Sequence, residues 1–121
     1  GDTVDKETVI RAVKDMFKDK PDIVPTADVI IDEVCKFYNI DPPTLRGQGR
    51  SKDISTARQI AMYLIRRMTN LSLKEIGREF DNRDHTTVLH SIERIEDLSK
   101  NDPERTEIIK DIIANINSRY E

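Results

Sequence analysis

Residues 72–98, SLKEIGREFDNRDHTTVLHSIERIEDL, decide the fold of this chain. They begin with a capping-box pattern, in which the Ser72 hydroxyl can accept from the backbone N–H of Glu75 and the Glu75 carboxylate from the backbone N–H of Ser72. This pattern predicts a short helix. Three polar residues, 81–83, then form a turn, and Asp84 can cap a longer helix with apolar residues at helical spacing. A short helix, a tight turn and a longer helix make a helix-turn-helix, a layout that also occurs in proteins without a nucleic-acid partner.

Upstream of this motif, the sequence predicts two further helices and a loop. Thr26 can cap a helix that ends near Asn39, and Asp41, followed by two prolines, can start a short helical turn. The segment 46–53 holds two glycines and three basic residues and is expected to be a loop. A second capping-box pattern at 56–59 then predicts the start of the helix that has the strongest apolar periodicity in the chain.

Downstream, Asp102 followed by proline predicts the start of the last helix. Strand-like alternation is absent from the sequence, so the fold class is predicted to be all-α, a cluster of five or six helices. The side chains expected to face its core are Ala27, Ile30, Ile31, Val34, Phe37, Ala57, Ile60, Ala61, Leu64, Ile65, Met68, Leu73, Ile76, Phe80, Val88, Ile92, Ile95, Leu98, Ile108, Ile109, Ile112, Ile113 and Ile116.

The chain is expected to divide into two parts. Residues 4–18 carry an apolar stripe at helical spacing, and Pro21 and Pro25 interrupt the chain after them. We therefore predict a connector helix and linker over 1–24 and a helix-turn-helix domain over 25–121. Long apolar runs and a signal-like start are absent, which predicts a cytoplasmic protein without membrane spans. The single cysteine, Cys35, has no partner for an internal disulfide and is expected to be packed in the core.

Charge is unevenly distributed along the sequence. The whole chain has a net charge of −3, which by itself argues against a nucleic-acid partner. Residues 46–94, however, hold ten Lys or Arg against six Asp or Glu, while the remainder of the chain carries a net −7. A basic block between acidic ends is typical of a binding face, although a solvated helix surface can give the same pattern.

The first turn of the longer helix carries side chains that can read base edges. Asp84 can accept from cytosine N4, His85 can bond to bases, and the methyl group of Thr86 can pack on a thymine methyl. Two adjacent threonines are poor helix formers, which suggests that they were selected for another property. Asp84 can also serve only as the N-cap, or it can do both.

Other residues are candidates for phosphate and minor-groove contacts. Basic and amide side chains on the preceding helices, and free N–H groups at the start of the short helix, can follow a DNA backbone. Each basic residue alone is more often simply solvated. The basic loop with Arg50 can enter a minor groove. The phosphate candidates are Lys52, Arg58, Gln59, Arg66, Ser72, Lys74, Arg83 and Arg94.

Catalytic and metal sites are not expected. The sequence has no nucleophile motif and no glycine-rich phosphate loop. His85 and His90 are five residues apart, about 140° around a helix, which does not suit a shared metal ion. His90 is expected to be a structural histidine that forms hydrogen bonds within the fold.

Two runs of sequence resemble a known family. IGREFDNRDHTTVLH at 76–90 resembles the signature of the bacterial DnaA family, and ARQIAMYL at 57–64 resembles the helix before it. The similarity covers about residues 24–120, and residues 1–20 look like the last helix of that family's ATPase-domain lid. The resemblance implies a connector and a DNA-binding domain without the nucleotide site, in a longer protein that binds and hydrolyses ATP.

The resemblance also implies roles and partners. Residues matching Asp84, His85 and Thr86 read bases in the major groove, and the residue matching Arg50 enters the minor groove. The family residues that contact mainly the DNA phosphate backbone match Arg58, Gln59, Arg66, Lys74 and Thr87. The target is the AT-rich DnaA box at the replication origin, bound for initiation and regulation of replication. The other implied partners are the ATPase domain of the same protein and, near the linker, acidic phospholipid; the isolated fragment is expected to be monomeric.

The chain departs from the family pattern at two places. Asp81-Asn82 stands where the family usually has two glycines, so Asn82 is expected to adopt a left-handed conformation. Gln48 and Gly49 stand where the family is commonly basic. Two alternatives stay open: the same module in a mobile-element protein, and a protein-interaction domain that uses the apolar face of 4–18 and the isoleucine-rich last helix.

Overall fold

The structure is a computed structural model and describes residues 24–121. The predicted connector helix over 4–18 lies outside the described residues, and the domain boundary at 24/25 stays a prediction. Within 24–121 the chain forms six helices and no strand, which confirms the all-α fold class. The helices are α2 (Ala27–Tyr38), α3 (Pro42–Arg46), α4 (Lys52–Met68), α5 (Leu73–Glu79), α6 (His85–Asn101) and α7 (Pro103–Ser118).

Short polar side chains start the helices as the sequence predicts. Thr26, Asp41, Asp84 and Asp102 each accept a hydrogen bond from the first turn of the following helix. The capping box at the start of α5 is complete, with both reciprocal hydrogen bonds present. These caps satisfy backbone donors that a helix start leaves without an intrahelical partner.

The predicted start of α4 is wrong. Its N-cap is Ser51, whose hydroxyl accepts from the backbone N–H of Ile54, so Thr56 lies inside the helix. The loop between α3 and α4 therefore contains only residues 47–51. The first turn of α4 extends beyond the core, and its buried apolar pattern begins only at Ala57.

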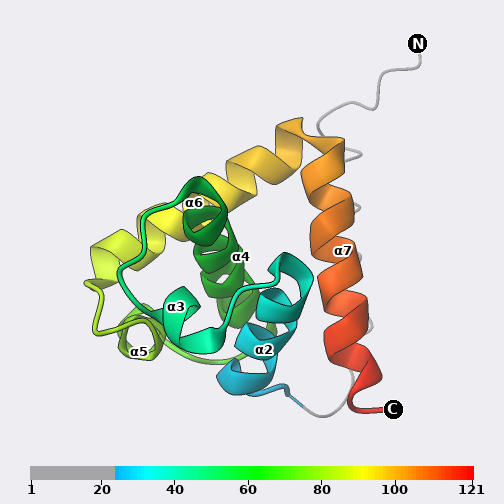
Figure 1. Cartoon of the computed structure of the whole chain (residues 1–121), viewed down its shortest axis with the longest axis horizontal. Coiled ribbons are helices and arrows are strands. Elements are labelled where there is room, and N and C mark those ends of the chain that lie inside the picture. Colours follow the sequence, from blue (N-terminus) through cyan, green and yellow to red (C-terminus); the bar gives the residue numbers. More distant parts are fainter. Residues whose placement is uncertain (1–23) are drawn as a thin grey trace.

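Helix α4 forms the centre of the domain. It lies between α2 and α6, and α7 packs against α2 and α6 on the far side (Figure 1). Tyr63 from α4 and Phe80 after α5 are the largest fully buried side chains, and Cys35 is buried as predicted. Phe37 is wrong as a core residue, because its side chain is 41% exposed and meets the edge of Tyr38 at the margin of α2.

A tight turn joins α5 to α6. The backbone N–H of Arg83 donates to the carbonyl of Gly77, and a Cβ on Gly77 would overlap the Arg83 carbonyl oxygen. Glycine is therefore required for this close approach. Asp81 and Asn82 both have positive φ, 60° and 54°, which confirms the left-handed conformation of Asn82 and adds a second such residue beside it.

Candidate nucleic-acid interface

The first turn of α6 is exposed on a helix whose other face is anchored in the core. Val88 and Ile92 are buried, whereas the side chains at 84–87 are exposed. The Asp84 carboxylate accepts from the Thr86 backbone N–H at 3.0 Å, and this hydrogen bond lowers the pKa of Asp84. His85 Nδ1 lies 3.6 Å from the Asp84 carboxylate. The cap is confirmed, and the side chains of His85 and Thr86 face outward from a fixed backbone.

Leu89 is a candidate contact that the sequence analysis missed. It is 40% exposed, one of three large apolar side chains that are exposed within 24–121. It follows His85 by four residues and Thr86 by three, so the three side chains share one face of α6. The i, i+3 and i, i+4 spacing from Thr86 and His85 is the sequence signal that identifies Leu89. The face can therefore offer apolar as well as polar contacts to a groove.

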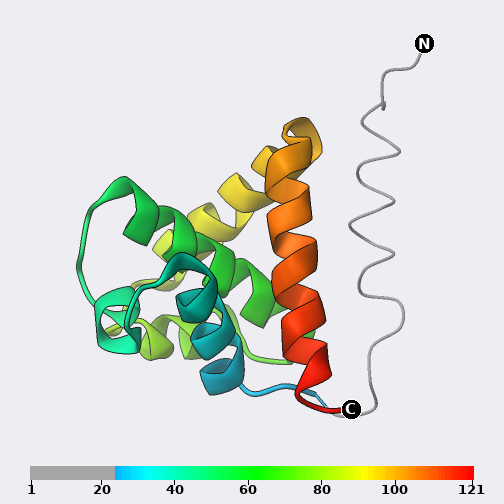
Figure 2. The same ribbon diagram turned by 45° about the vertical axis from the view of Figure 1, so that its right-hand side comes forward.

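The α3–α4 loop lies on the same side of the molecule as the start of α6, away from α7 (Figure 1 and Figure 2). Arg50 is exposed in this loop, and Lys52 is exposed in the first turn of α4. The two predicted reading elements are thus next to each other in the fold although more than thirty residues separate them in sequence.

Arg58 of α4, expected to contact DNA phosphate, is buried in the fold. It is 7% exposed. Its guanidinium donates to the carbonyls of Leu45 at 2.7 Å and Gly49 at 2.9 Å, and a third contact reaches Thr44 at 3.4 Å. Burial lowers the pKa of this guanidinium, and the positive charge of Arg83 lowers it further. Arg58 thus holds the end of α3 and the loop together.

Arg83 is also turned toward the loop. Its Nη2 donates to the carbonyl of Gly47 at 2.6 Å, and its Nη1 lies 3.5 Å from the side-chain oxygen of Gln48. The amide nitrogen of Gln48 in turn donates to the Asp81 carboxylate at 2.9 Å. The basic loop and the helix-turn-helix turn are therefore bonded to each other.

The remaining phosphate candidates lie at or near the surface. Ser72, Lys74, Arg66, Thr87 and Arg94 are exposed, and Gln59 is half-buried. Arg66 also donates to the Leu71 carbonyl at 3.1 Å, which ties the end of α4 to the start of α5.

His90 is exposed on α6 and forms no hydrogen bond through its side chain within residues 24–121, so its predicted role as a structural histidine bonded within the fold is wrong. Arg94 follows Thr87 by seven residues and lies on the same side of α6.

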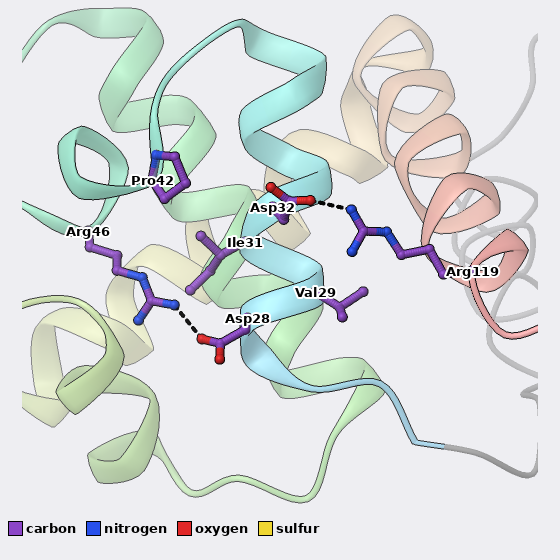
Figure 3. A pocket seen from close by; sticks show the side chains of 7 residues that line it. All are labelled: Asp28, Val29, Ile31, Asp32, Pro42, Arg46 and Arg119. Atoms are coloured by element: carbon purple, nitrogen blue, oxygen red, sulfur yellow. Dashed lines mark hydrogen bonds and ion pairs between the residues drawn. The ribbon is translucent and has the colours of Figure 1, made fainter.

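A hollow lies between α2, α3 and the end of α7, away from the first turn of α6. It has a volume of about 340 Å³ and is lined by two charged pairs and three apolar side chains (Figure 3). Arg46 binds Asp28 at 2.5 Å and Glu79 at 3.0 Å, and Arg119 binds Asp32. Both arginines that line the hollow are thus paired with carboxylates of the fold. Residues 24–121 contain no cluster of three potential metal ligands and no helix long and apolar enough to cross a membrane.

An exposed helix start behind a tight turn, with basic residues around it, defines a helix-turn-helix DNA-binding domain. Residues 27–95 match the family described as bacterial dnaA protein helix-turn-helix, and the chain belongs to this family.

Two relatives show how much of a longer protein the chain represents. Over 62% of its length it is 53% identical to the chromosomal replication initiator protein DnaA of Synechococcus sp. (strain JA-2-3B'a(2-13)), of which it covers 16%. Over 82% of its length it is 46% identical to the protein of the same name from Caldanaerobacter subterraneus subsp. tengcongensis, of which it covers 22%. The chain thus spans less than a quarter of either relative.

Proposed function

We propose that this domain binds double-stranded DNA at DnaA-box sites of a replication origin and so contributes to the initiation of chromosomal replication. The observation that carries the proposal is the first turn of α6, where exposed polar side chains stand on a helix fixed by its cap and its core face. A recognition helix presents its N-terminal residues to the major groove in this way. Both named relatives are chromosomal replication initiators, which supports this parent over a mobile-element protein.

We assign reading roles to the two neighbouring elements. Asp84, His85 and Thr86 read base edges in the major groove, and Leu89 adds an apolar contact suited to thymine methyl groups. Arg50 reads the minor groove from the α3–α4 loop. The proposed phosphate contacts are Lys52, Gln59, Arg66, Ser72, Lys74, Thr87 and Arg94. Arg58 and Arg83, which bond to loop carbonyls, act as positioning residues in place of the phosphate role first expected.

A protein-interaction domain is less well supported. The isoleucines of α7 that would form its docking face at 109, 112, 113 and 116 are buried in the core. ATP binding and hydrolysis, and contacts with an ATPase domain or acidic phospholipid, are proposed only for the longer protein.

The test compares affinities for a duplex carrying a DnaA box and for a scrambled duplex at one salt concentration. His85→Ala or Thr86→Ala should lower the matched-to-scrambled ratio by about 5- to 150-fold, which corresponds to about 1–3 kcal/mol of base discrimination. Melting temperatures should stay near that of the parent chain, because both side chains are exposed. Asn115→Ala, an exposed neutral site on α7, is the matched control. An unchanged ratio in both variants would overturn the assigned role of this turn.

A further inference from the structure

The α3–α4 loop must be positioned by hydrogen bonds. Its first three residues are Gly47, Gln48 and Gly49, which offer no large apolar side chain to the core. Ordering such a segment costs conformational entropy that hydrophobic burial does not offset here. Two arginines from different elements supply the bonds, Arg58 of α4 at the Gly49 carbonyl and Arg83 of the turn before α6 at the Gly47 carbonyl.

The side chain of Gln48 lies between these backbone contacts and the turn. Its amide nitrogen donates to Asp81, and its amide oxygen lies within reach of the Arg83 guanidinium. A primary amide can donate and accept at the same time, whereas a lysine or arginine can only donate. A basic residue at 48 would therefore bond to Asp81 but place a second positive charge beside Arg83.

The carboxylate of Asp81 accepts the hydrogen bond that the Gln48 amide donates. It stands at a position with positive φ, where glycine would fit without strain, and it provides an acceptor that glycine lacks. Gln48 and Asp81 are thus bonded to each other at 2.9 Å although 33 positions separate them in sequence. Each side chain supplies the hydrogen-bond partner of the other.

We propose that Gln48, Asp81 and Arg83 form a latch that holds the α3–α4 loop against the helix-turn-helix turn. The latch fixes the spacing between Arg50 and the first turn of α6, so that both grooves are read by one rigid unit. This inference rests on the proposed function, since it assigns positioning residues to the same DNA site.

The test uses Gln48→Ala, Asp81→Gly and the double variant, with the two duplexes described above. We expect each single variant to lower the matched-to-scrambled ratio about fivefold, the effect of one lost hydrogen bond. The double variant should lower the ratio by no more than either single variant, because both substitutions remove the same hydrogen bond. In an Arg50→Ala background the same changes should have no further effect on the ratio. Glu93→Gln, which removes an exposed acid from α6, controls for the lost negative charge.

The outcomes separate the latch from the proposed function. An acid that merely repels DNA would, once removed, raise affinity for both duplexes equally, and that result in Asp81→Gly overturns the latch. Unchanged ratios in the variants overturn it as well. A parent chain that shows no preference for the matched duplex overturns the proposed function and the latch with it.

A measurement without DNA checks the loop directly. The backbone N–H of Gly47, which donates to the Thr44 carbonyl at 3.3 Å, should exchange faster in Gln48→Ala and Asp81→Gly than in the parent chain, whereas the amides of α4 should exchange at the same rate. Unchanged exchange at Gly47 would overturn the latch even if the variants bound DNA less well.

Discussion

The two elements that face the proposed DNA site are held in place by opposite means. The start of α6 is anchored by its own apolar face, through Val88 and Ile92, and by its own N-cap. The α3–α4 loop has no such face and is held by Arg58 and Arg83, which reach it from other elements. The exposed side chains of His85 and Thr86, proposed to read DNA from α6, can therefore change without loss of folding, whereas the loop depends on side chains to which we assign no DNA contact.

The largest expected effect comes from Gly77 in α5. Gly77 packs against the turn that leads into α6 and is bonded to the α3–α4 loop. In Gly77→Ala the new Cβ would overlap the Arg83 carbonyl and force the turn to shift. We expect a cost of about 3 kcal/mol, the upper part of the range for overpacking, and a fall in melting temperature of about 10 °C or more. The preference for matched DNA should fall with it.

Gly49→Ala is the control for this substitution. A Cβ there meets mainly side-chain carbons of Ile54, which can adjust, and its φ is not positive. Its melting temperature should therefore change little. If Gly77→Ala melted with the parent chain, the close approach described for this turn would be wrong.

Arg58 gives the next largest effect and tests how the loop is held. Arg58→Ala removes the donor from buried carbonyls at the end of α3 and in the loop, at a cost of about 2 kcal/mol in the free energy of unfolding. Arg58→Lys should recover little, because an ammonium group cannot reproduce the guanidinium fork. Thermal or denaturant unfolding measures both.

Lys74→Ala, at an exposed site, supplies the contrast in DNA binding. It should leave stability unchanged and lower the slope of log affinity against log salt by about one, since one phosphate contact is lost. Arg58→Ala should lower affinity without that change in slope. A slope lowered by about one in Arg58→Ala, with unchanged melting, would return Arg58 to the phosphate contacts.

The same contrast explains what the sequence could predict. N-caps such as Thr26, Asp41 and Asp102 depend on three or four neighbouring residues, so local chemistry was sufficient to find them. The start of α4 was missed because the buried apolar pattern begins only at Ala57, directly after Thr56, whereas the helix already begins at Lys52 behind the N-cap Ser51.

The role of Arg58 could not be read from its own helix. Its burial depends on the carbonyls of a loop that folds over it, which is a tertiary contact. The bond between Gln48 and Asp81 joins residues 33 positions apart and left no local signal. The exposed first turn of α6 was predictable because cap and periodicity together set the direction of its side chains.

The smallest expected effect concerns pH and the anchoring of α6. The hydrogen bond from the Thr86 N–H holds the pKa of Asp84 below its ordinary value of 3.8. The ionised carboxylate therefore makes its whole contribution to the free energy of unfolding above pH 3.8. That contribution is lost as pH falls through the lowered pKa of the folded state. Asp84→Asn keeps a capping oxygen but does not titrate. The melting temperature of the parent chain should therefore fall slightly more between pH 6 and pH 3 than that of the variant, and an equal fall would contradict this account.

Burial of the single cysteine has a practical consequence for chemical labelling. Desolvation raises the pKa of Cys35 to about 11, and its side chain is 3% exposed. At pH 8 only about one thiol in a thousand would be the reactive thiolate, and it would be buried in the core. A thiol introduced by Arg50→Cys on the exposed loop would react far faster than Cys35. Probes can thus be attached to the loop of the otherwise unaltered chain, and slow modification of Cys35 would report how often the core opens.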